Sequence, residues 1–233
     1  MLFGKDLCHK IRSIYLRSWM VHLDVTNCEV DVFAHIEYGI DEDLFINSSY
    51  IVAGQKANNC EFPSIVSLQI QKNGKTFLCG GSIMDANHVI TAAHCVASGV
   101  TRIIVFYGAT SAAQAKVTYA TKINAHLGFY TTSRALRTSQ PTTYLRKVSL
   151  PIMSYKECHA QWNYIGHEHI CAGDWIPGGA SPCQGDSGGP LYCMSNGHYV
   201  LAGLVSFGLK CEYGPAMYTS VSYFRTWINA NTV

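Results

Sequence analysis

The chain has 233 residues, of which 48% are apolar and 14% are charged, with 20 glycines, ten cysteines and a formal net charge of +2. This length supports one or two packed cores, and the low charge with abundant glycine favours a loop-rich all-β protein. The basic residues are scattered, which argues against a nucleic-acid binder, and no run approaches the roughly 18 apolar residues of a membrane-spanning helix.

Residues 1–50 carry four Lys/Arg against eight Asp/Glu, whereas residues 51–233 carry thirteen against seven. No signal-peptide pattern can be recognised, because charged residues interrupt every apolar stretch at the N-terminus. Ten cysteines nevertheless favour an oxidising compartment, so we expect a secreted protein. Residues 1–50 are interpreted as an atypical leader, which is either the product of an alternative or incorrect first exon or an unusual pro-segment.

From Ile51 onward, short β-rich runs alternate with turns. Residues 64–70 form the first expected strand, and Asn73-Gly74 is a strong hairpin signal before a second strand over residues 76–83. Further strands are expected over residues 102–107, 116–123, 144–152, 199–207 and 216–221, and a terminal helix over residues 223–230.

Three short motifs carry chemical information. The sequence QGDSGGP at residues 184–190 surrounds Ser187 with glycines and a proline, which is typical of a tight turn with exposed backbone. Such a turn can present a hydroxyl while directing N–H groups to the same point, as an oxyanion hole requires. Upstream lie TAAHC at residues 91–95 and IVAG at residues 51–54, and the latter could become a new N-terminus after a cut.

Together, and in this order, the motifs resemble the trypsin/chymotrypsin family of serine proteases, and the resemblance spans residues 51–233. It implies an all-β fold of two six-stranded antiparallel barrels with a C-terminal helix, the first barrel over about 51–135 and the second over about 140–233. It further implies a serine endopeptidase in which Ser187 is the nucleophile, His94 is the general base, and the N–H groups of Gly185 and Ser187 form the oxyanion hole. We expect no metal or other cofactor, polypeptide substrates or protease inhibitors as partners, and a monomer.

The resemblance also implies activation by cleavage before Ile51, after which the new amine pairs with Asp186. The preceding residue is Tyr50, so an activating protease would not be trypsin-like; the alternative is that no cut occurs. The primary pocket implied by the family has Ser181 at its base. Its walls are Gly208 and Ala216, and Ser206 begins the rail that pairs with substrate. Without an acid at the base, the pocket is expected to prefer Phe, Tyr or Leu.

The cysteines match the family in three pairs: Cys79 with Cys95, Cys158 with Cys171, and Cys183 with Cys211. Cys60 and Cys193 lack their expected partners and could pair with Cys8 and Cys28, but spacing does not decide connectivity. The ligand types in Cys158, His159, His167, His169 and Cys171 also permit a zinc site, which the disulfide interpretation disfavours.

The third catalytic residue is missing from its usual place. A catalytic histidine needs a buried acid to fix its tautomer, yet no Asp or Glu occurs between His94 and Glu157. A contiguous deletion between Tyr130 and Tyr144 would remove the aspartate strand, the linker and a strand of the second barrel. Each barrel is therefore expected to lack one strand, and activity is expected to be weak or lost. The alternatives are a non-catalytic homologue that acts by binding, and a truncated splice or gene-model product.

Overall fold

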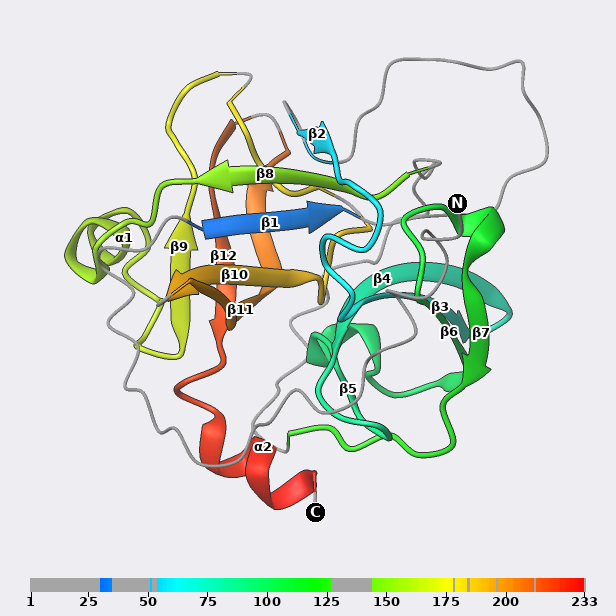
Figure 1. Ribbon diagram of the computed structural model, residues 1–233. Helices are drawn as coiled ribbons and strands as arrows, with labels where there is room; N and C mark the ends of the chain where they lie inside the picture. Colours follow the sequence, from blue (N-terminus) through cyan, green and yellow to red (C-terminus); the bar gives the residue numbers. More distant parts are fainter. Residues whose placement is uncertain are drawn as a thin grey trace, which may run out of the picture.

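The computed structural model describes residues 30–34, 51, 54–126, 144–177, 179–183, 185–195, 197–211 and 213–232. Two groups of antiparallel strands form the fold (Figure 1). The first contains β3 (Ile65–Lys72), β4 (Lys75–Ile83), β5 (Val89–Ile90), β6 (Val100–Tyr107) and β7 (Lys116–Tyr119). The second contains β1 (Val30–Ala34), β2 (Gln55–Lys56), β8 (Arg146–Leu150), β9 (His169–Ala172), β10 (Pro190–Ser195), β11 (His198–Lys210) and β12 (Tyr213–Ser220).

The first sheet has the strand order β5-β4-β3-β6-β7 and begins with the predicted hairpin. Lys72 pairs with Lys75, and the two residues between them, Asn73 and Gly74, have φ values of 51° and 73°. Positive φ at both central residues defines the turn whose twist matches the flanking strands. Apolar residues on these strands and on the segment after β5 meet in one buried cluster: Val66, Leu68, Ile70, Cys79, Ala92, Cys95, Ile103 and Val105.

The second sheet has the order β2-β8-β1-β10-β11-β12-β9 and its own core. Buried residues of five of its strands make up that core: Leu150, Ile170, Ala172, Leu191, Cys193, Ala202, Val205, Ala216 and Tyr218. Two sheets with separate cores and a C-terminal helix, α2 (Arg225–Asn231), confirm the all-β fold that the sequence predicted.

The strand count differs between the two sheets. Among the described residues the first sheet has five strands. In the second sheet β1 lies between β8 and β10, so this sheet does not show the expected gap. β1 comes from residues 1–50, the segment interpreted as a leader. The predicted deletion and the barrel boundary near residues 135–140 lie outside the described residues.

Several boundaries also differ from the predictions. The strand expected over residues 116–123 ends at Tyr119, and residues 120–125 are exposed without regular structure. The terminal helix begins at Arg225, after turns over residues 221–224. Sequence inspection missed β9, β10 and the helix α1 (Tyr155–Gln161).

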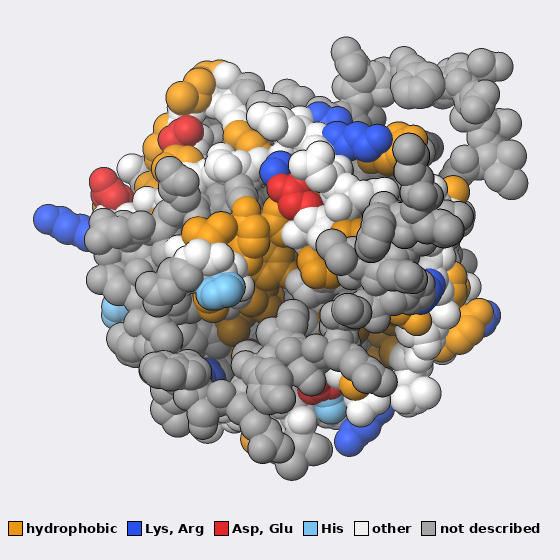
Figure 2. Space-filling model, in the orientation of Figure 1, with side chains coloured by type: hydrophobic (Ala, Val, Ile, Leu, Met, Phe, Trp, Pro, Cys, Tyr) orange, Lys and Arg blue, Asp and Glu red, His pale blue; other side chains and the backbone are white. Residues whose placement is uncertain are grey.

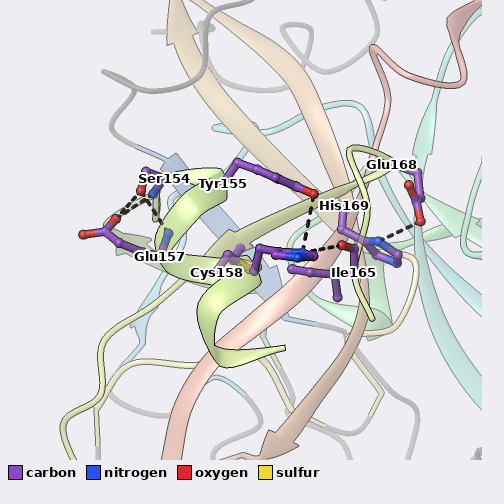
Figure 3. The surroundings of a disulfide bond; sticks show 9 residues. Ser154, Tyr155, Glu157, Cys158, Ile165, Glu168 and His169 are labelled. Atoms are coloured by element: carbon purple, nitrogen blue, oxygen red, sulfur yellow. Dashed lines mark hydrogen bonds and ion pairs between the residues drawn. A yellow bond between two sulfur atoms is a disulfide. The ribbon is translucent and has the colours of Figure 1, made fainter. Parts of the chain in front are cut away.

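Helix α1 has a clear start signal in the sequence. Ser154 accepts a hydrogen bond from the Glu157 N–H, and the Glu157 carboxylate accepts one from the Ser154 N–H (Figure 3). This reciprocal capping box satisfies N–H groups that have no partner within the helix. Both helices of the described residues have seven residues, and neither is long and apolar enough to cross a membrane.

A Ser154→Ala substitution is expected to lower the free energy of unfolding by about 1 kcal/mol, because it removes the N-cap acceptor. Urea denaturation of this variant and of Ser98→Ala, at an exposed serine outside any helix, measures the difference. Equal midpoints for the two variants would contradict a role for the cap in stability.

On the described part of the face in Figure 2, Lys and Arg side chains are dispersed among uncharged ones and do not form a continuous stripe. Hydrophobic side chains gather near the centre of the same face. Nucleic-acid binders concentrate basic residues on one surface, so this face offers no support for such a function.

Candidate active site

The turn that carries Ser187 is held by its own backbone. The Asp186 N–H donates to the Cys183 carbonyl (3.1 Å), and the Gly189 N–H donates to the Asp186 carbonyl (2.8 Å). The Asp186 carboxylate accepts a hydrogen bond from the Cys183 N–H at 2.7 Å and is fully buried. Gly185 and Gly188 have φ values of 97° and 79°, a region that other residues rarely adopt.

His94 lies in a short 3₁₀ helix, Ala93–Cys95, directly after β5. The disulfide between Cys79 and Cys95 ties this helix to β4, with a Cα–Cα distance of 6.3 Å. A ring nitrogen of His94 lies within 4.8 Å of both sulfur atoms, and the residue is partly exposed. The histidine is therefore held near the surface by a buried covalent bond.

The serine turn of the second sheet contacts the histidine segment of the first. The Gly80 N–H donates to the Ser187 carbonyl at 2.8 Å, and Thr91 Oγ1 donates to the Gly80 carbonyl at 2.7 Å. The Sγ atom of Cys95 lies 3.6 Å from the Ser187 carbonyl oxygen, across a sequence separation of 92 residues. These contacts bring together the two segments that the motifs singled out.

Gly80 and Thr91 were not identified as site residues from the sequence. Gly80 permits a close approach, because a Cβ at this position would lie 2.7 Å from the Gly189 Cα. The pair Gly80-Gly81 within an otherwise β-rich run was the available signal, since glycine inside a strand often marks a close backbone approach.

Two of the predicted pocket residues, Gly208 and Ala216, are paired in the second sheet, and a third, Ser206, lies on the same strand as Gly208. Gly208 in β11 pairs with Ala216 in β12, and a Cβ on Gly208 would lie 3.7 Å from the Ala216 Cβ. Ala180 packs against the core cluster that contains Ala216, and the next residue, Ser181, is 4% exposed and donates its hydroxyl to the Pro182 carbonyl at 3.1 Å. Ser206 is partly buried in β11.

The residues predicted for the activation ion pair, Ile51 and Asp186, are both fully buried. Ile51 packs with Val148, and its carbonyl accepts a hydrogen bond from the Gly54 N–H at 3.2 Å. Burial, together with the negative charge of Asp186, raises the pKa of the Tyr218 hydroxyl well above its usual value. The ion pair itself stays a prediction.

The three disulfides implied by the family resemblance are present: Cys79–Cys95, Cys158–Cys171 and Cys183–Cys211. Because Cys158 and Cys171 are bonded to each other, neither supplies a thiolate ligand, and the zinc interpretation is wrong for this pair. The Cys183–Cys211 bond, with a Cα–Cα distance of 4.8 Å, joins the start of the serine turn to the end of β11. Disulfides of this kind indicate maturation in an oxidising compartment.

His169 lies in β9, and its ring packs edge-on against Phe207 at 5.6 Å between centroids. Burial lowers the pKa of His169, although the Glu168 carboxylate, 3.4 Å from Nδ1, acts in the opposite direction (Figure 3). The neutral ring is therefore favoured in the folded state.

This lowered pKa predicts a pH-dependent loss of stability. The neutral His169 ring contributes to the free energy of unfolding above the pKa of the unfolded chain, about 6.5. This contribution is lost as the pH falls through that value towards the lower pKa of the folded state. We expect a His169→Gln variant to lose less stability than the native chain between about pH 7.5 and pH 5, measured by urea midpoints. His167→Gln, at an exposed position, serves as the control; a native-like pH slope in His169→Gln would contradict this origin.

Comparison with known proteins identifies the family and supports the fold. The profile of the family described as Trypsin matches residues 51–135 and 127–228. Trypsin-1 of Astacus astacus is 32% identical over 239 residues, covering 78% of this chain and all of that protein. Chymotrypsin-like elastase family member 1 of Canis lupus familiaris is 28% identical over 245 residues, covering 81% of this chain and 94% of its own length.

A solved structure of HL collagenase superposes with a TM-score of 0.69 at 24% identity and covers 78% of this chain and 98% of that chain, which supports the fold. The fold and the junction of the Ser187 turn with the His94 segment thus define a chymotrypsin-fold protease. The chain belongs to the trypsin family of serine endopeptidases.

Proposed function

We propose that this protease cleaves polypeptides after large apolar or aromatic residues, with Ser187 as nucleophile and His94 as general base. The observation that supports this proposal is the contact between the serine turn and the histidine segment through Gly80 and Thr91. In the proposed reaction the histidine takes the Ser187 hydroxyl proton while the oxygen attacks the scissile carbonyl. The N–H groups of Gly185 and Ser187 stabilise the oxyanion, and the amine leaves with the same proton, which leaves an acyl group on Ser187. Water, deprotonated by His94, then attacks this ester, and His94 returns the proton to the Ser187 oxygen as the carboxylic acid product leaves.

We further propose that turnover is weak. No Asp or Glu lies between His94 and Glu157 in the sequence, and loss of the triad acid lowers turnover by about 10⁴-fold. The lack of an acidic residue in this stretch also favours a second candidate function: a non-catalytic homologue that binds peptides or inhibitors in the former active-site cleft.

For activation we propose a cut between Tyr50 and Ile51 in a secreted, monomeric protein. The full burial of both Asp186 and Ile51 supports this step, because a cation offsets the desolvation cost of a buried carboxylate, and a free amine at Ile51 would add that charge to the hydrogen bond from the Cys183 N–H. The activating protease would accept Tyr at the cleaved bond.

A fluorophosphonate probe tests the function. We expect Ser187 to be labelled after cleavage before Ile51, and more slowly in the uncut chain, as measured by mass spectrometry of peptides. Retained binding of a peptide inhibitor without any labelling would identify the non-catalytic homologue and contradict the endopeptidase.

Ser181 is the residue that tests the proposed pocket. We expect Ser181→Asp to bind benzamidine about 10- to 100-fold tighter than Ser181→Asn, because a hydrogen bond to a charged group contributes about 1.5–3 kcal/mol. Isothermal titration calorimetry measures both affinities without requiring catalysis. Equal affinities would show that residue 181 does not form the base of the pocket.

A further inference from the structure

We propose that Val30–Ala34, which form β1, are a permanent structural component of the protease domain, because they supply the strand that completes the second sheet. β1 lies between β8 and β10 and is antiparallel to both (Figure 1). Its five residues, Val30–Ala34, pair with Arg146–Leu150 of β8, and its first three pair with residues 191–193 of β10.

Hydrogen bonding is the first argument for this role. Interior strands of a sheet pair on both sides, and a strand without a neighbour exposes a row of N–H and C=O groups. Without β1, β8 would keep only its two-residue pairing with β2, in which Gln55 and Lys56 face Lys147 and Arg146. β10 would keep β11 alone as its neighbour.

The register gives a second argument. Val30 lies opposite Leu150 of β8 and Cys193 of β10, and Val32 lies opposite Val148 and Leu191. Leu150, Leu191 and Cys193 belong to the buried core of the second sheet. Two apolar positions of β1, Val30 and Val32, therefore lie in register with apolar residues of both neighbouring strands, as expected for a strand that the sheet requires.

The cysteines give a third argument. Cys60 and Cys193 are disulfide-bonded, yet neither belongs to the three pairs described above. Of the ten cysteines in the sequence, Cys8 and Cys28 then remain, both within residues 1–50. Cys28 precedes β1 by two residues, and Cys193 faces the first residue of β1. We therefore expect residues 1–50 to be joined to residues 51–233 by a disulfide bond as well as by the pairing of β1.

The strand role does not depend on the proposed protease activity. What the strand means for activation does rest on the proposed protease activity. If the chain is cut between Tyr50 and Ile51, β1 would stay paired in the second sheet, so the product would be a two-chain protein and the N-terminal segment would not be released.

The first experiment cuts the linker without changing β1. A recognition sequence for a site-specific protease is inserted between residues 34 and 51 of the full chain, and the chain is cut under non-reducing conditions. We expect both fragments to co-elute as one monomer, to stay joined on a non-reducing denaturing gel, and to keep slow amide exchange over residues 30–34. Release of the N-terminal fragment from a folded body, rapid exchange over residues 30–34, or a dimer that exchanges strands between copies would each overturn the proposal.

A second experiment tests the strand itself. Proline at a central strand position removes a ladder hydrogen bond, whereas threonine keeps the N–H and a β-branched side chain. We expect Val32→Pro to lose amide protection in β8 and β10, and Val32→Thr to retain it. Unchanged protection of β8 and β10 in Val32→Pro would overturn the proposal.

Discussion

Replacing Ser187 with alanine is expected to reduce kcat/KM for amide hydrolysis by about 10²-fold, in contrast to the loss of about 10⁶-fold that follows removal of the serine from an intact triad. The triad residues act as a unit, so their removal is strongly non-additive. Loss of the acid alone costs about 3 × 10⁴ and loss of all three about 2 × 10⁶, which leaves a factor of about 10² for the serine once the acid is gone.

The size of this effect therefore reports whether a carboxylate supports His94. Initial rates with a Phe-anilide substrate, normalised to the concentration of folded protein, give the ratio, and Ser98→Ala is the control at an exposed serine. A fall of about 10⁶-fold would contradict the incomplete triad and would mean that an acid from elsewhere in the chain reaches the histidine. No measurable difference would instead favour the non-catalytic homologue.

Replacing Gly188 with alanine is expected to be strongly destabilising. The new Cβ would collide with Thr91 Oγ1 and would lie 2.7 Å from the Gly80 carbonyl oxygen and 2.8 Å from the Ala92 nitrogen. Positive φ costs a non-glycine residue about 1–2 kcal/mol, and overpacking costs about 1–3 kcal/mol more, which gives a loss of about 2–5 kcal/mol in the free energy of unfolding. The serine turn would have to move away from the histidine segment, so labelling of Ser187 should also fall.

Gly108→Ala is a matched control. Gly108 has the same φ of 79°, but a Cβ there would meet nothing within 4 Å. The difference in urea midpoint between the two variants therefore isolates the steric contact from the backbone strain. Equal midpoints would mean that the serine turn relaxes freely and that its packing on the first sheet contributes little.

Local signals made much of this fold predictable. Asn73-Gly74 specifies its turn through the φ values that these two residues tolerate, and the strands on either side follow. The family motifs located the three disulfides and the two segments that meet at the candidate active site. The capping residues Ser154 and Glu157 also carried a usable signal for α1, which the search for alternating strands overlooked.

The position of β1 could not be predicted from the same signals. Its pairing depends on β8 and β10, which are distant in the sequence, and register between distant strands is set by the packed sheet. A five-residue run such as Val30–Ala34 gives no local indication of which neighbours it will join. The interpretation of residues 1–50 as an atypical leader or pro-segment did not include this pairing for that reason.

The hydrogen bond from the Gly80 N–H to the Ser187 carbonyl crosses from one sheet to the other. Because each sheet has its own core, a separation of the two sheets at this contact would leave both folded and yet move Ser187, the proposed nucleophile, away from His94, the proposed base. The exchange rate of the Gly80 amide hydrogen would then measure how often the two sheets separate at this contact.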